Sequence, residues 1–225
     1  MSDTVLLLHG FATSALRTWH ETGWVDLLQD SGKTVRAPDI PGHGTAERFH
    51  DPAAYGDVEG AVAEHLGDSP VDVVGFSQGA RLALELACTY PERVDRLVLI
   101  GIGANLFSKD DSFATTLSAV LDGSRSPKTP PEHHFLQLAN AEDQDPLALA
   151  AFLRRPRPPE LTEARVSEIS HPTLLIVGTA DFVWPPDDLT AVLPHAKLVP
   201  LNGVDHFATP KNFDCISAAL EFLDA

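Results

Sequence analysis

The chain has 225 residues, of which 44% are apolar and 21% are charged, and its formal net charge is −16. This length and composition predict one core-forming domain, or two small ones, and exclude a disulfide-stapled miniprotein and a disordered or fibrous chain. A surface this acidic repels phosphate backbones and anionic lipids, so nucleic acid and membrane surfaces are not the expected partners.

Six short segments along the chain predict strands, and among them the wholly apolar run at residues 5–8 predicts a strand buried in a parallel sheet. In chain order they are residues 5–8, 34–37, 71–74, 97–100, 173–177 and 197–201. Helix-like segments alternate with them, at residues 24–29, 55–66, 78–90, 189–193 and 213–223. Such alternation is typical of parallel βαβ units. The sequence therefore predicts an α/β fold, with a doubly wound, mainly parallel six-stranded sheet and helices on both faces.

One stretch, from about residue 102 to residue 170, interrupts the alternation. It contains several helix-like pieces and no strong strand. An insertion of this kind is either a lid over a site or a cluster of helices that pack on the sheet. We expect residues 1–101 and 171–225 to form the core, and residues 102–170 to form a small helical cap.

The cysteines and the N-terminal residues indicate the compartment. Cys88 and Cys215 form no disulfide framework and lie in helix-like stretches, which suits a reduced protein. The apolar run at residues 5–8 has no basic residues before it and is too short for a signal peptide or a membrane span. We therefore expect a cytoplasmic protein.

The strongest local signal is the sequence Gly-Phe-Ser-Gln-Gly at residues 75–79. It lies between a predicted strand and a predicted helix, where a sharp turn lifts a serine above the edge of the sheet. The crowded backbone of such a turn requires a glycine on either side. The hydroxyl of Ser77 would then stand at the amino end of the helix, whose free N–H groups favour negative charge. Ser77 is therefore the candidate nucleophile.

A serine nucleophile needs a base, and the base needs an orienting acid. His206 follows the last predicted strand, and Asp181 follows the strand at residues 173–177. Because the carboxyl ends of parallel strands share one edge of an open sheet, we expect Ser77, Asp181 and His206 to converge there.

The residues after the first predicted strand, His9-Gly10-Phe11, suit a second role. The backbone N–H of Phe11, beside that of Gln78, would donate to the oxyanion of a tetrahedral intermediate. His9 itself is expected to hold its loop rather than to carry a proton.

Together these motifs resemble the α/β-hydrolase fold superfamily. They are the turn at residues 9–11, the Asp-Ile-Pro-Gly-His-Gly stretch at residues 39–44, the serine turn at residues 75–79, Asp181 and His206. The resemblance covers nearly the whole chain apart from the insertion, and it is specific for the superfamily but not for the reaction.

The resemblance implies a role for each candidate. Ser77 would be the nucleophile, His206 the general base and then acid, and Asp181 the orienting carboxylate. Phe11 and Gln78 would supply the oxyanion-hole amides, and the insertion would form a cap over the pocket.

Two features depart from the superfamily pattern. Most members carry two further strands before the His-Gly turn, so the resemblance implies a sheet shortened to six strands. Asp205 stands where many members have glycine. It is a competing carboxylate near His206, although adjacency in the sequence makes it a poor partner for the ring.

The sequence predicts no metal site and no cofactor. The pair His133-His134 lacks the Cys, His or carboxylate spacing typical of a metal site. No Gly-x-Gly-x-x-Gly or phosphate loop implies a nucleotide or a flavin. His43 is expected to satisfy the loop that contains it. The expected partner is a small-molecule substrate, and the oligomeric state stays open between monomer and homodimer.

The favoured function is a serine hydrolase that cleaves a small carboxylic ester through an acyl-enzyme intermediate. Serine at the turn argues against epoxide hydrolases and haloalkane dehalogenases, which in this superfamily use aspartate there. The candidates for an apolar substrate pocket, which equally suit packing of the cap, are Leu106, Phe107 and Phe135.

Two alternative functions stay open. The first keeps the three residues and changes the reaction, to thioester or carbon–carbon hydrolysis, a cofactor-free perhydrolase or a lyase, because a triad does not define the substrate. The second is a binding protein on a hydrolase scaffold, which the intact set of three groups disfavours.

Overall fold

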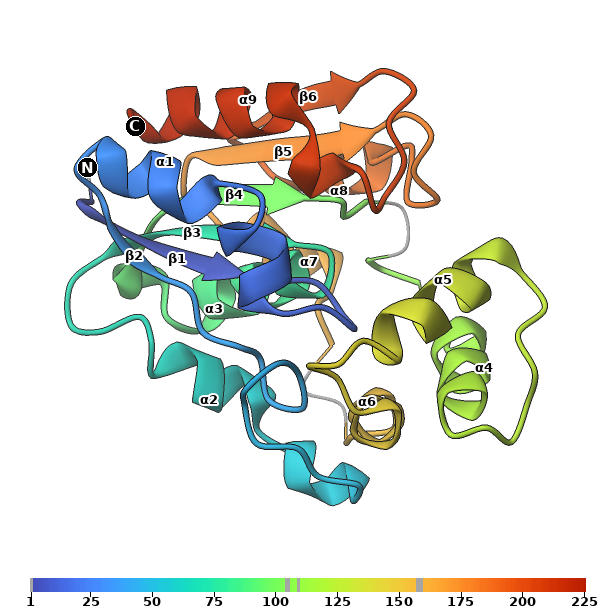
Figure 1. Cartoon of the computed structure of the whole chain (residues 1–225). Helices are drawn as coiled ribbons and strands as arrows, with labels where there is room; N and C mark the ends of the chain where they lie inside the picture. Colours follow the sequence, from blue (N-terminus) through green and yellow to red (C-terminus); the bar gives the residue numbers. More distant parts are fainter. Residues whose placement is uncertain (1, 104–105, 109, 157–159) are drawn as a thin grey trace.

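The computed structural model describes residues 2–103, 106–108, 110–156 and 160–225. Over these ranges six strands form one parallel sheet in the order β2-β1-β3-β4-β5-β6 (Figure 1). They are β1 (Thr4–Leu8), β2 (Thr34–Arg36), β3 (Val71–Phe76), β4 (Val94–Ile100), β5 (Thr173–Gly178) and β6 (Ala196–Leu201). Each lies where the sequence predicted a strand, so the predicted six-stranded sheet is confirmed.

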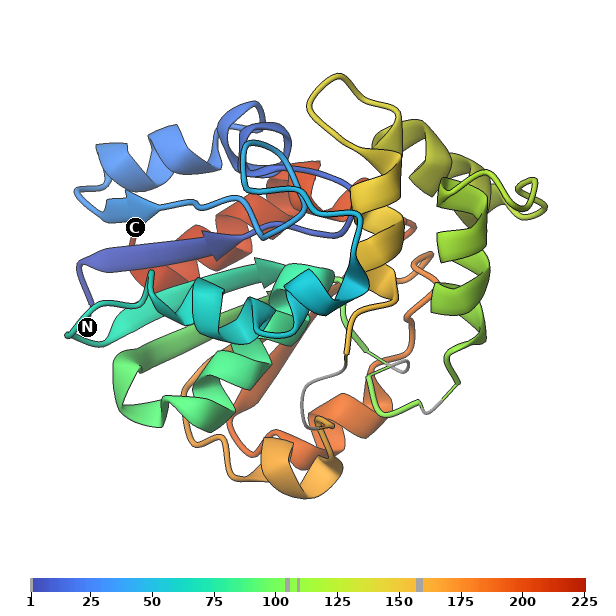
Figure 2. The ribbon, with the colours of Figure 1, turned by 90° about the horizontal axis from the view of Figure 1, so that it is seen from below.

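Helices cover both faces of this sheet, which confirms the doubly wound arrangement (Figure 2). One face is covered by α1 (Trp24–Asp30) and α9 (Phe213–Leu223). The other face is covered by α2 (Val58–Ala63), α3 (Gln78–Thr89) and α8 (Asp187–Val192).

β1 shows why its sequence reads as one apolar run. Leu6 and Leu8 belong to the core beneath α2 and α3, whereas Val5 and Leu7 belong to the core beneath α1 and α9. All four side chains are fully buried. A strand that is buried on both faces has no position for a polar side chain, so its sequence does not alternate.

The order of the strands reverses beside β1. The chain passes from β1 to β2 at one edge, then returns across β1 to β3 and continues to β6 at the other edge. The helices α1 and α3 that come after β1 and β3 lie on opposite faces. In open α/β sheets a crevice forms at such a reversal, at the carboxyl ends of the strands. The loops after β1 and β3 therefore border it.

Part of the long insertion lies beyond the carboxyl ends of the strands (Figure 1). In its described residues the helices there are α4 (Ser112–Leu121), α5 (Pro130–Ala139) and α6 (Pro146–Leu153). A further helix, α7 (Glu163–Ser167), packs instead against α3 and α8. Residues 104–105, 109 and 157–159 of the predicted cap lie outside the described part of the chain.

The helix-like segment predicted at residues 55–66 is confirmed only in its middle part. The structure has a short 3-10 helix at Pro52–Tyr55 and begins α2 only at Val58. The side chain of Asp57 explains the break, because its Oδ1 accepts from the N–H of Gly60 at 2.9 Å. A side chain that accepts a hydrogen bond in this way starts a new helix rather than continuing an old one.

Both termini lie at the end of the sheet away from α4, α5 and α6 (Figures 1 and 2). Arg96 of β4 secures the C-terminal one, since it pairs with Asp224 at 2.7 Å as well as with the buried Asp72 at 2.8 Å. Within the described ranges, no helix has both the length and the apolar character needed to cross a bilayer.

Candidate active site

The turn between β3 and α3 holds Ser77 in an unusual backbone conformation. Its φ of 54° and ψ of −111° lie outside the regions that residues with a Cβ normally adopt. A Cβ on Gly75 would lie 2.3 Å from the carbonyl oxygen of Gly79, and a Cβ on Gly79 would lie 2.0 Å from that of Leu8. Both glycines are therefore required by close approach of the helix and the neighbouring strand, as the sequence predicted, and the surrounding packing maintains the strain at Ser77.

Replacement of Gly79 by alanine is expected to lower the free energy of unfolding by about 3 kcal/mol, because the added methyl group overlaps main-chain atoms of β1. Gly56→Ala is the matched control, since the nearest atom to its Cβ would be 3.4 Å away. Urea unfolding of both variants measures the difference. A Gly79→Ala variant as stable as Gly56→Ala would show that the turn has room to relax.

The side chains of Ser77, His206 and Asp181 form one hydrogen-bonded chain. Nδ1 of His206 lies 2.8 Å from Oδ2 of Asp181, and Nε2 lies 3.0 Å from Oγ of Ser77. With the Nδ1 proton donated to the carboxylate, Nε2 presents its lone pair to the serine hydroxyl. His206 and Asp181 are only 3% and 5% exposed, so water has little access to the hydrogen bond between them.

The loops after β5 and β6 hold the acid and the histidine opposite each other. Oδ1 of Asp181 accepts from the N–H of Val183 at 3.0 Å, which orients the carboxylate. The N–H of Ala180 donates to the carbonyl oxygen of Val204 at 3.1 Å, which joins the two loops. The spacing between Asp181 and His206 therefore follows from backbone contacts as well as from their own hydrogen bond.

Asp205, the alternative carboxylate, is engaged elsewhere. Its Oδ1 accepts from the N–H of Ala208 at 2.9 Å, in the turn that precedes the last helix. Asp205 is exposed, whereas the carboxylate that contacts the His206 ring is the buried one of Asp181.

Aromatic rings pack around His206. The ring centroids of Phe76, Phe182 and Phe207 lie 5.0, 4.4 and 5.4 Å from that of the imidazole. His134 of α5 packs on Phe207 in turn, with centroids 3.8 Å apart. These rings restrict the orientation of the imidazole and keep water from its faces.

The loop that leaves β1 lies against the serine turn, since a Cβ on Gly10 would lie 3.5 Å from the Cβ of Ser77. His9 holds this loop: its Nδ1 donates to the carbonyl oxygen of Gly10 at 2.7 Å, and its Nε2 accepts from the N–H of Ile40 at 2.9 Å. Burial lowers the pKa of His9, so the ring is neutral. His43 is also buried, which lowers its pKa to about 3, and it contacts a carbonyl of its own loop at 3.2 Å. Both rings serve the loops that contain them.

A cavity of about 660 Å³ opens in front of Ser77. His206, Phe11 and Gln78 also border it. Gln78 is the first residue of α3, so its N–H has no acceptor within the helix. The structure thus brings the predicted nucleophile, its base and both candidate amide donors to one cavity.

The walls of this cavity were predicted only in part. Leu106 and Phe135 line it, whereas Phe107 packs against the core and is not among the described lining residues. The charged side chains of the walls were not predicted; they are Arg81, Asp110, Asp111 and Arg155. Arg81 had a signal, since a residue four positions after Ser77 lies on the same side of the helix. The others lie on connecting segments, where no periodic pattern predicts direction.

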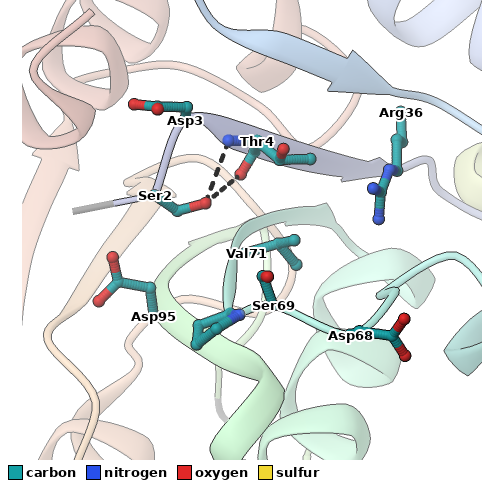
Figure 3. Close-up of a pocket in the computed structure, with 9 residues that line it drawn as sticks. Ser2, Asp3, Thr4, Arg36, Asp68, Ser69, Val71 and Asp95 are labelled. Carbon is teal, nitrogen blue, oxygen red and sulfur yellow. Dashed lines mark hydrogen bonds between the residues drawn. The ribbon is translucent and has the colours of Figure 1, made fainter.

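A second cavity, of about 700 Å³, lies near the amino ends of β1, β3 and β4 (Figure 3). Its lining is mostly polar, and Ser2 and Thr4 within it form a hydrogen bond of 3.0 Å. The described residues that line it include no histidine. The arrangement suited to nucleophilic chemistry is therefore at the opposite end of the sheet.

The histidine pair of the insertion is divided between two environments. His133 is exposed, while His134 packs on Phe207. In the part of the chain that the structure describes, no group of three or more His, Cys, Asp or Glu side chains is arranged to hold a metal ion.

The chain is similar in sequence to known hydrolases. The sequence model of the protein family described as the alpha/beta hydrolase fold matches residues 3–134. The pimeloyl-[acyl-carrier protein] methyl ester esterase of Nitrosomonas europaea is 27% identical over 222 residues, which cover 87% of this chain and 85% of the esterase. The 2-hydroxy-6-oxononadienedioate/2-hydroxy-6-oxononatrienedioate hydrolase of Cupriavidus pinatubonensis is 26% identical over 243 residues, which cover 92% of this chain and 81% of that hydrolase.

A solved structure shows the same fold. The crystal structure of a hydrolase from Pseudomonas aeruginosa PA01 superposes on this chain with a TM-score of 0.75. The superposed region covers 100% of this chain and 91% of that hydrolase. The two sequences are 22% identical, so this likeness concerns the fold.

Proposed function

The chain is an enzyme of the alpha/beta hydrolase fold family, and on that premise we propose that it is a serine hydrolase that cleaves a small carboxylic ester through an acyl-enzyme intermediate. The observation that carries the proposal is the hydrogen-bonded chain from Ser77 through His206 to Asp181. A hydroxyl beside a base that a buried carboxylate orients is the arrangement that activates serine for acyl transfer.

Acylation begins when Oγ of Ser77 attacks the ester carbonyl carbon and Nε2 of His206 takes the hydroxyl proton. The carbonyl oxygen becomes an oxyanion, and the N–H groups of Phe11 and Gln78 are its proposed donors. When the intermediate collapses, His206 returns the proton to the departing alkoxide and the acyl group stays on Ser77. Asp181 keeps the Nδ1 proton in place and stabilises the imidazolium.

Deacylation repeats these steps with water. His206 takes a proton from the water as its oxygen attacks the acyl carbon, and the oxyanion forms at the same amide donors. Collapse breaks the bond to Ser77, and the proton passes from His206 to Oγ. The acid leaves, and the serine hydroxyl is restored.

The cavity supports a small-molecule substrate. Its volume of about 660 Å³ is in the usual range for small-ligand sites. Leu106 and Phe135 of the insertion provide apolar surface in the cavity that Ser77 also lines. We propose that α4, α5 and α6 act as the cap over this cavity, and that the acyl or alcohol part of the ester packs against them.

Hydrolysis of a carbon–carbon bond beside a ketone is the second candidate. The relative from Cupriavidus pinatubonensis, which is named for an oxo-dioate substrate, favours it because the similarity extends over 92% of this chain. The same three side chains suit either reaction, since both require an oxyanion on a carbonyl oxygen. The nature of the bond that breaks is decided by the substrate that the cap admits.

A reducing compartment suits the cysteines of the chain. Cys88 and Cys215 are both free thiols, and burial raises the pKa of Cys215 to about 12. We propose a cytoplasmic site of action on the ground of these unpaired thiols.

One equivalent of a fluorophosphonate is expected to add to Ser77, with loss of fluoride, and p-nitrophenyl butyrate is expected to give a burst of p-nitrophenol equal to the labelled sites. Intact-mass analysis and peptide mapping locate the adduct. Ser108→Ala is the matched control, because Ser108 is a second serine that lines the same cavity. Its replacement should leave fluorophosphonate labelling unchanged.

Two results would change the proposal. An adduct on Ser77 without ester turnover would favour the carbon–carbon candidate, which ketone substrates then test directly. A folded protein that forms no adduct would contradict an activated serine altogether.

A further inference from the structure

The turn between α5 and α6, residues 140–145, lies against the loop that leaves β1. Asp143 uses both carboxylate oxygens there: Oδ2 accepts from Oγ of Ser14 at 2.8 Å, and Oδ1 accepts from Nε of Arg17 at 2.7 Å. Burial would raise the pKa of this carboxyl, but the hydrogen bonds from Ser14 and Arg17 outweigh it and hold the pKa below its usual value. A charged side chain of the insertion therefore contacts the loop that carries Phe11.

Neighbouring groups extend this contact. Nε2 of Gln144 donates to the carbonyl oxygen of Thr13 at 3.1 Å, and Nη2 of Arg48 donates to the carbonyl oxygen of Asp143 at 2.8 Å. The turn is thus joined to the core by hydrogen bonds that each involve at least one side chain, and those to Thr13 and Ser14 reach the loop that leaves β1, residues 9–15, which we call the β1 loop.

This loop needs support because its backbone is strained. Ala12, next to Phe11, has a φ of 58°, a left-handed conformation that residues with a Cβ rarely adopt. Asp39 supports the loop from the core, where its Oδ1 accepts from the N–H of Ala15 at 2.7 Å. Asp143 supports it from the insertion. The loop is therefore held from two sides.

The side chain of Phe11 depends on the same helices. Its ring centroid lies 5.9 Å from that of Phe135 on α5 and 6.0 Å from that of Phe152 on α6. These are the two helices that the turn of Asp143 connects. A shift of the α5–α6 pair would therefore act on the ring of Phe11 and on the residues that follow it.

We propose that Asp143 is a positioning residue that holds the β1 loop so that the N–H of Phe11 faces the oxyanion. This rests on the proposed function, in which Phe11 is one of the two oxyanion donors. Seating of the α5–α6 turn on the core and completion of the oxyanion hole then occur together. Substrate binding in the cavity does not require this contact, but stabilisation of the tetrahedral intermediate does.

The test compares binding of a transition-state mimic with binding of its ground-state counterpart. A trifluoromethyl ketone forms a tetrahedral adduct with Ser77, whose proton passes to His206 while the ketone oxygen becomes an oxyanion. The methyl ketone of the same chain length occupies the cavity without that step. In Asp143→Ala we expect kcat/KM for p-nitrophenyl butyrate and affinity for the trifluoromethyl ketone to fall together by about 10- to 100-fold. The effect of losing one oxyanion donor completely is the upper limit of this decrease. Affinity for the methyl ketone should change by less than about threefold.

Asp145→Ala is the matched control. Asp145 is the N-cap of α6: its side chain accepts from the N–H of Leu147 at 2.9 Å, and it pairs with His50 at 2.8 Å. Removal of the Asp145 carboxylate weakens α6, the helix that follows the turn of Asp143, without removing any contact to the β1 loop. We expect Asp145→Ala to lower the Tm while affinity for the trifluoromethyl ketone, per labelled site, stays within about threefold of wild type.

Arg17→Met gives a second approach from the core side. It removes one of the two hydrogen bonds of Asp143, so it should reproduce part of the loss. The double variant Arg17→Met/Asp143→Ala should lose no more than Asp143→Ala alone, because both changes break one interaction. Arg17→Met keeps the test available if Asp143→Ala does not fold.

The outcomes separate this inference from the proposed function. Wild-type protein that neither turns over the ester nor binds the trifluoromethyl ketone would contradict both the proposed function and the positioning role of Asp143. An active wild type together with folded Asp143→Ala and Arg17→Met variants that bind both ketones normally would overturn the positioning role alone. Equal losses for the two ketones would also overturn it, since they would indicate a general disturbance of the cavity.

Discussion

Ser77→Ala and His206→Ala are each expected to lower kcat for ester hydrolysis by about 10⁴- to 10⁶-fold, and the double variant is expected to lose no more than either single one. The reason is the geometry of the proton transfer: Nε2 of His206 lies 3.0 Å from Oγ of Ser77. Without the imidazole the hydroxyl is a poor nucleophile, and without the hydroxyl the imidazole has no proton to take. The two residues act as one unit, so their contributions do not add.

The measurement is kcat for p-nitrophenyl butyrate in the two single variants and the double variant. Thermal unfolding serves as the control for folding, because neither truncation removes a large part of the core. Multiplied losses in the double variant would contradict a shared proton-transfer step. A fully active His206→Ala would assign the base to another residue.

Asp181→Asn is expected to lower kcat by about 10³- to 10⁴-fold, whereas Asp205→Asn should stay within about threefold of the unaltered enzyme. The carboxylate of Asp181 lies 2.8 Å from Nδ1 of His206. The amide keeps the shape but loses the charge that stabilises the imidazolium and the acceptor that selects its tautomer. Asp205 contacts the N–H of Ala208 instead.

The two amide variants are isosteric and differ only in which carboxylate they remove, so each controls for the other. Steady-state kinetics with one ester measures both, and fluorophosphonate labelling counts the folded sites. A large loss in Asp205→Asn with an active Asp181→Asn would exchange the roles of the two acids. Equal modest losses would mean that neither carboxylate orients the histidine alone.

Much of the fold could be predicted from local patterns. The strand β1, which is buried on both faces, reads as a continuous apolar run, and all six segments predicted as strands proved to be strands of the sheet. The turn at residues 75–79 was recognisable because close backbone contacts at Gly75 and Gly79 leave no room for a Cβ. The apolar runs and the spacing of the glycines around Ser77 can be seen within a few residues, so the sequence displays them directly, although the contact that requires Gly79 is with Leu8 of β1.

Other features depend on contacts between distant segments. The break before α2 follows from one capping hydrogen bond of Asp57, a small local energy that the apolar pattern of residues 55–66 does not reveal. Phe107 and Phe135 look alike in sequence, yet one packs on the core and the other lines the cavity. Phe107 lies in a turn before α4 and Phe135 lies on α5, and the packing of these segments in space decides which side chain borders the cavity.

The amino-acid sequence was sufficient to predict the order of strands and helices along the chain, the serine turn, and the strands after which Ser77, Asp181 and His206 would stand. Apolar runs and the spacing of the glycines around Ser77 are visible within short segments of the chain, which explains this success. The three-dimensional structure was needed to show that Asp143 contacts Ser14 and Arg17, more than 120 residues away in the sequence. Those contacts arise from the packing of whole elements against one another, and no pattern within a single segment encodes which side chains then meet.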